Sequence, residues 1–118
     1  MQVQVSTDKN IDGREALERW AETELADKLA HFRADITRVE VHLSENSKKG
    51  EEDRRCVMEA RLAAHPPLAV SHHAPGLDEA FRGALAKLKH VLDSTTGREK
   101  NHRDRESIRR DIETPILD

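Results

Sequence analysis

Seven histidines and one cysteine are the residues that could carry metal or nucleophilic chemistry in this chain. His72 and His73 are adjacent in a strand-like run, so their side chains point to opposite faces and cannot share one ion there. No Cys, Asp or Glu lies at a recognisable ligand spacing from His42, His65 or His72. Cys56 alternates with apolar residues, which is typical of a small buried side chain rather than of a nucleophile. The sequence therefore predicts no metal site.

The sequence also contains no residue pattern that would support acid–base catalysis or cofactor binding. The acidic run 51–53 follows Gly50 in a stretch without apolar residues, so it is expected to be an exposed loop and a poor scaffold for proton transfer. No G-x-S-x-G, P-loop or dinucleotide fingerprint is present. We therefore predict a protein that is not an enzyme, uses no cofactor or small-molecule substrate, and functions through its surface.

The strongest feature of that surface is a basic segment. Residues 82–110 contain nine Lys or Arg and four acids, a balance of +5, although the whole chain carries −3. Such a segment can bind phosphate in an acidic protein, or it can be a solvated, salt-bridged helix surface. No exposed aromatic residue is evident, so recognition of an RNA backbone and its shape is favoured over base stacking.

Periodicity indicates the elements that position these residues. Four runs alternate with period two and predict strands, at residues 2–6, 37–44, 55–64 and 68–72. Two apolar stripes with three- and four-residue spacing predict helices. The first spans about five turns after an N-cap at Asp12, and Trp20 in its stripe is expected to pack on the sheet near Val39 or Val41. The second begins near residue 77 and is expected to end at Asp93 to Gly97, with Gly97 as a left-handed cap.

Together these elements predict one α+β domain in the order β-α-β-β-β-α. Every strand has one apolar face, so both helices should cover the same face of a four-stranded mixed sheet, and the other face should stay exposed. A right-handed crossover makes the first two strands parallel. The domain should span residues 1–95, followed by a charged tail, 96–118, that is either disordered or a helical extension. No apolar run approaches the roughly 18 residues of a membrane span, so we expect a soluble cytoplasmic protein.

Three segments, in this order and spacing, resemble the ribosome hibernation and translation-inhibitor family, also called sigma-54 modulation or ribosome-associated proteins. They are the strand run 35–41, the first helix from Ala16 to the closing His31-Phe32, and the second helix 77–92 with its Lys87-Leu88 pair. The resemblance covers roughly residues 1–95. It implies the same fold, topologically akin to a double-stranded-RNA-binding domain (dsRBD-like). It also implies a short form without the C-terminal dimerisation domain, hence an expected monomer.

The resemblance implies a partner and a set of contacts. Family members bind the small ribosomal subunit in the channel used by mRNA and tRNA, and they inhibit translation in stationary phase or stress. Their basic helix side chains contact the 16S-type rRNA. Lys87 matches a family lysine, Lys89 and His90 fall in the same motif, and Lys28 and Arg33 would border the same groove by position. Lys87→Glu is therefore expected to weaken ribosome binding more than Lys89→Glu.

Two hypotheses follow for the function. The first is a non-enzymatic ribosome-binding inhibitor, with Arg98 and Lys100 of the basic segment as further RNA contacts. The second is a stress-regulatory protein-interaction domain that has the same fold and does not bind RNA. The second is motivated by the net charge of −3 and by Glu24, where family members often carry Lys.

Overall fold

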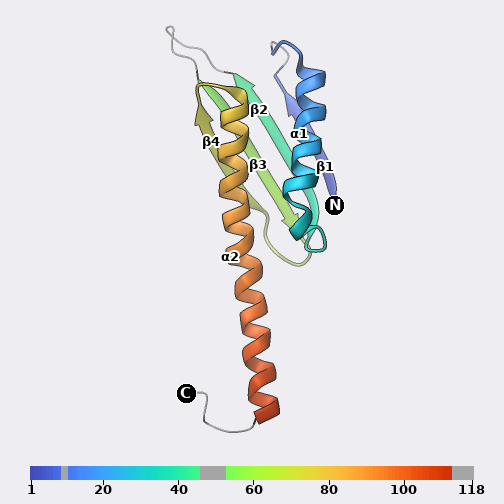
Figure 1. Cartoon of the computed structure of the whole chain (residues 1–118), viewed down its shortest axis with the longest axis vertical. Helices are drawn as coiled ribbons and strands as arrows, with labels where there is room; N and C mark the ends of the chain where they lie inside the picture. The colour runs from blue at the N-terminus through green and yellow to red at the C-terminus, as the bar shows by residue number, and fades with distance from the viewer. Residues whose placement is uncertain (9–10, 46–52, 113–118) are drawn as a thin grey trace.

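The computed structural model describes residues 1–8, 11–45 and 53–112, with side chains described as far as residue 96. The observed order is β-α-β-β-β-α, as predicted, with one turn of 3₁₀ helix (η1) after the first α-helix (Figure 1). The elements are β1 (Gln2–Thr7), α1 (Arg14–Lys28), η1 (Ala30–Phe32), β2 (Ile36–Glu45), β3 (Arg54–Leu62), β4 (Leu68–Ala74) and α2 (Leu77–Ile112).

The four strands form one mixed sheet in the order β1-β2-β3-β4. β1 and β2 run parallel, with Val5 opposite Val41, because α1 carries the chain back across the sheet between them. The two remaining pairs are antiparallel. Figure 1 shows α1 and α2 side by side on the same face of this sheet. The predicted fold class is therefore confirmed.

The core lies between the sheet and the two helices. Alternate residues of β2 and β3 are buried on the helix side, because a strand turns successive side chains to opposite faces. The stripes of both helices meet them and complete one apolar cluster. Its most completely buried large side chains are Leu25, Leu29, Val39, Leu43, Cys56, Met58, Phe81, Leu88 and Leu92.

Trp20 connects the two helices. Its ring centroid lies 5.0 Å from that of Phe81 in α2, with the ring planes tilted by 55°. The indole is only partly buried at the margin of the core. The ring of Trp20 therefore contacts the neighbouring helix, which the sequence did not predict. The indole also packs against the core cluster to which Val39 and Val41 belong.

Both helix boundaries differ from the prediction. The N-cap of α1 is Gly13, with φ 66° and ψ 27°, and no side chain caps the helix, so the predicted cap at Asp12 is wrong. A left-handed backbone at this position favours glycine. Gly97 does not end the second helix, because α2 continues to Ile112. A single helical glycine costs only about 1 kcal/mol, and the residues after it include many good helix formers and no proline before residue 115.

α2 is consequently much longer than the face that it covers. Its 36 residues correspond to roughly 54 Å of helix. Figure 1 shows its C-terminal half projecting beyond the sheet. Within the described residues, no helix combines the length and apolarity that a membrane span requires.

Gly83 allows α2 to lie close to β4. A Cβ atom at this position would overlap the imidazole of His72. Alanine normally stabilises a helix interior by about 1 kcal/mol relative to glycine, but forced overlap in a packed region costs roughly 1–3 kcal/mol. We expect Gly83→Ala to lower the free energy of unfolding by about 1 kcal/mol, as the balance of these two effects.

The matched control for this prediction is the same replacement in a His72→Ala background. There the overlap is absent, so Gly83→Ala should raise stability by about 1 kcal/mol. Urea unfolding can be followed by the fluorescence of Trp20, the only tryptophan. Stabilisation in both backgrounds would show that the imidazole does not press on α2.

Candidate nucleic-acid interface

The side-by-side helices leave a groove on the outside of the domain. Three of its lining residues are cations, contributed by both helices, and one is a carboxylate. The lining residues are Glu24, Lys28, Arg82, Leu85, Ala86 and Lys89. The groove thus combines a net positive charge with a short apolar floor.

Helical spacing turns these side chains toward one another. Arg82 and Lys89 are seven residues apart, so they lie two turns apart on one face of α2. Glu24 and Lys28 are four residues apart on the facing side of α1. Arg82 was missing from the sequence-predicted contacts. Its seven-residue spacing from Lys89 could have indicated that the two side chains share one face of the helix.

The groove cations are not neutralised by strong ion pairs. Lys28 Nζ lies 3.9 Å from Asp27 Oδ2, and both side chains are more than half exposed, so this pair contributes little. Arg82 and Lys89 are exposed and have no ion-pair partner among residues whose side chains are described. All three cations can therefore meet an anionic partner.

Lys87 lies on a different side of α2. Its Nζ donates a hydrogen bond of 2.8 Å to the carbonyl oxygen of Ser71 in β4, which is an edge strand. Two residues along a helix correspond to about 200°, so Lys87 and Lys89 point to opposite sides. A lysine on a sheet edge also discourages pairing with another chain. The groove brings together Lys28 and Lys89, but not Lys87.

The other predicted contacts lie outside the groove lining. Arg33 is exposed just after η1, and His90 is exposed about 100° around α2 from Lys89. Arg98 and Lys100 belong to the part of α2 for which only the backbone is described.

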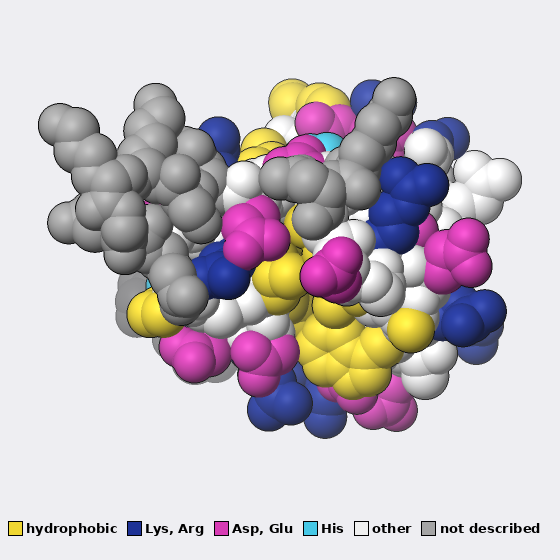
Figure 2. All heavy atoms as spheres, turned by 90° about the horizontal axis from the view of Figure 1, so that it is seen from above, with side chains coloured by type: hydrophobic (Ala, Val, Ile, Leu, Met, Phe, Trp, Pro, Cys, Tyr) yellow, Lys and Arg dark blue, Asp and Glu magenta, His cyan; other side chains and the backbone are white. Residues whose placement is uncertain are grey.

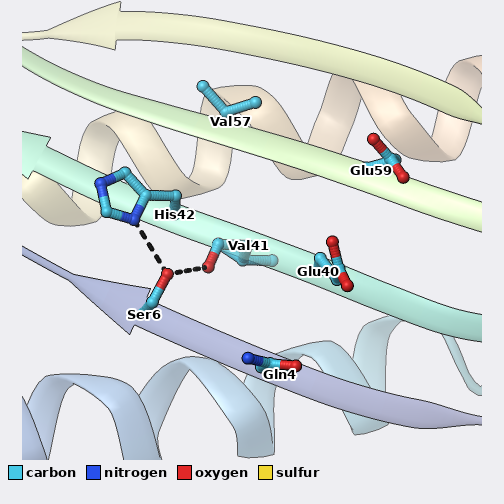
Figure 3. A pocket seen from close by; sticks show the side chains of 7 residues that line it. All are labelled: Gln4, Ser6, Glu40, Val41, His42, Val57 and Glu59. Atoms are coloured by element: carbon cyan, nitrogen blue, oxygen red, sulfur yellow. Dashed lines mark hydrogen bonds between the residues drawn. The ribbon is translucent and has the colours of Figure 1, made fainter.

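The open face of the sheet carries a hydrogen-bonded row that the sequence did not reveal. Figure 3 shows the part of this row that joins Ser6 to His42 and Val41. Ser6 Oγ lies 2.9 Å from His42 Nδ1, and His42 Nε2 lies 3.2 Å from Asp8 Oδ1. The backbone N–H of Glu45 donates to the other Asp8 oxygen at 3.2 Å. These residue types resemble a nucleophilic triad. Here they tie β1 and the residue after it to the C-terminal half of β2, and Ser6 Oγ also donates to the Val41 carbonyl oxygen at 3.4 Å.

Four charges on this open face neutralise one another. Arg38 is opposite Arg61, and Glu40 is opposite Glu59, in the β2–β3 register. Ion pairs of 2.8 Å, Arg38 to Glu40, and 3.0 Å, Arg61 to Glu59, run along the strands. The hydrogen bond that Arg61 donates to Glu59, with the nearby charges of Glu40 and Glu59, raises the pKa of Arg61. These four charges are thus paired, whereas Arg55, exposed on the same face, has no ion-pair partner among the residues whose side chains are described.

Metal and thiol chemistry gain no support from the geometry. No three His, Cys, Asp or Glu side chains in the described residues are placed to hold a metal ion. Cys56 is fully buried on the helix side of β3, and this burial raises the pKa of its thiol to about 12. Its position is that of a small core residue, as the sequence indicated.

The chain thus folds as a mixed four-stranded sheet covered on one face by two helices, with a groove between the helices that three cations and one carboxylate line. Residues 3–100 match the family described as sigma 54 modulation protein / S30EA ribosomal protein. The chain belongs to this family, as its sequence segments suggested.

Solved structures share the fold. The N-terminal domain of Protein Y from Thermus thermophilus is 18% identical, with a TM-score of 0.65 over 80% of this chain and 99% of that one. A ribosomal subunit interface protein from Coxiella burnetii is 15% identical, with a TM-score of 0.65 over 82% of this chain and 99% of that one. No curated protein sequence matches the chain.

Burial of Cys56 predicts a pH dependence of stability. The folded-state pKa of its thiol is about 12, against an ordinary value of 9.0, so the unfolded chain ionises first as the pH rises. The stability contributed by the neutral thiol is complete below about pH 9 and declines toward pH 12, by up to about 1.4 kcal/mol per pH unit. Urea unfolding across this range should show a steeper decline for the parent than for Cys56→Ala. Parallel curves would contradict the burial.

Proposed function

We propose that this protein binds the ribosome, through the small subunit, and inhibits translation without catalysing a reaction. In this proposal it occupies the mRNA/tRNA channel as a monomer and contacts 16S-type rRNA in the cytoplasm during stationary phase or stress. Membership of the S30EA family supports the ribosomal partner. The name of one structural relative, a ribosomal subunit interface protein, points the same way.

The groove between α1 and α2 is the observation that carries the proposal. Lys28, Arg82 and Lys89 converge there from two rigid helices. Each phosphate that such a cation neutralises releases condensed counterions, which is the main source of affinity for a nucleic-acid backbone. The ion-paired charges of the open sheet face lack this capacity.

Further contacts would extend from the groove. Arg33 lies beyond η1, and Lys87 and His90 lie on other sides of α2. We propose these residues as outer contacts at the margin of the footprint. Arg98 and Lys100, on the same long helix, would continue the contact along the RNA.

The direct test is sedimentation of a stationary-phase lysate on a sucrose gradient at low salt. The protein should migrate with the small subunit or with whole ribosomes. If it stays at the top of the gradient, the ribosomal proposal is wrong.

Charge reversal in the groove tests which surface binds. Lys89→Glu or Arg82→Glu should weaken binding to purified small subunits about tenfold. Each should also reduce the slope of the log binding constant against log salt concentration by about one, which is the contribution of one phosphate contact. Arg61→Glu, on the open sheet face, is the matched control and should have a much smaller effect. Because Lys87 lies at the sheet edge, we now expect a smaller loss from Lys87→Glu than from Lys89→Glu, the reverse of the order expected from the sequence. A dominant loss from Arg61→Glu would place the interface on the sheet.

The alternative is a protein-interaction domain that does not bind RNA. It is favoured by the net charge of −3 and by the interspersed acidic and basic side chains visible in Figure 2. Salt discriminates the two functions. RNA binding should weaken by nearly one logarithmic unit per tenfold increase in salt for each phosphate contact. A protein partner on a mixed-charge surface should show a shallow dependence.

A further inference from the structure

Glu24 is the one carboxylate in the lining of the groove. It is half-buried, whereas Glu22, two residues earlier in α1, is exposed and lies about 200° around the helix. The groove therefore carries three cations and one fixed anion. An anionic ligand that contacts the cations must come close to this carboxylate.

Two physical effects give Glu24 a consequence for binding. It repels a phosphate in the groove, and the repulsion grows when the ligand displaces water and lowers the local dielectric constant. It also lies four residues before Lys28, the favourable orientation for a Glu–Lys pair on a helix. Glu24 can thus compete with a phosphate for the ammonium group of Lys28.

We infer that Glu24 limits the affinity of the groove for RNA, an inference that rests on the proposed function. The carboxylate lowers the positive potential on the α1 side, so the stronger phosphate contacts fall to Arg82 and Lys89 on α2. Binding of RNA is consequently weaker, and dissociation faster, than it would be if the groove held the three cations without Glu24.

The experiment compares Glu24→Gln with Glu22→Gln. Both replacements are nearly isosteric and change the net charge by the same amount, so long-range electrostatics are matched. The dissociation constant for purified small ribosomal subunits is measured at fixed low salt, and thermal melts verify folding. We expect Glu24→Gln to lower the dissociation constant about fivefold and Glu22→Gln by less than about twofold.

Three other outcomes are distinguishable. Equal tightening by both variants would mean that only net charge matters, and the inference would be wrong. Weaker binding by Glu24→Gln would also overturn it, because the carboxylate would then accept a hydrogen bond from a base amino group. Absence of binding by the parent and by both variants would refute the proposed function itself.

Discussion

The apolar face of β2 and β3 has to be covered, and in the described part of the chain the amphipathic helices α1 and α2 cover it. Val39 and Val41 of β2 and Met58 of β3 are buried beneath the helices. Each such side chain contributes roughly 1.5–3 kcal/mol when it is removed from water. Two helices set side by side on one sheet necessarily leave a groove between their outer surfaces. The charged residues that line this groove are ones that the core does not use, whereas Leu85 belongs to both. Packing therefore determines where the charges converge.

Periodicity predicted most of the fold because burial here is one-sided. Strands that alternate and helices with a single stripe have only one economical arrangement, and the structure has it. The helix ends were less predictable. Gly13 caps α1 through its backbone conformation rather than through a side chain, and Gly97 continues α2 because neighbouring residues favour helix. Both outcomes depend on small differences in backbone energy. The presence of a glycine or a nearby Asp in the sequence does not by itself show where a helix begins or ends.

The candidate site was predicted in part. Lys28 and Lys89 lie in the groove, whereas Lys87 reaches the sheet edge and binds a backbone carbonyl. Helical spacing separates the two lysines, but only the position of β4 shows which of them meets the other helix. The hydrogen-bonded row from Ser6 through His42 to Asp8 could not be predicted from the sequence. It depends on the parallel register that sets Ser6 opposite His42, which are 36 residues apart in the chain.

Three cations without strong ion pairs converge in the groove, whereas four charges of the open sheet face are paired. The proposed function requires the groove to be the face that meets RNA. Photo-cross-linking from single cysteines in a Cys56→Ala background tests this most directly. Ala86→Cys places the probe in the groove, and Arg61→Cys places it on the open sheet face. With small ribosomal subunits, we predict cross-links to rRNA from position 86 and not from position 61. Cross-links from position 61 alone would contradict the groove as the RNA-binding face.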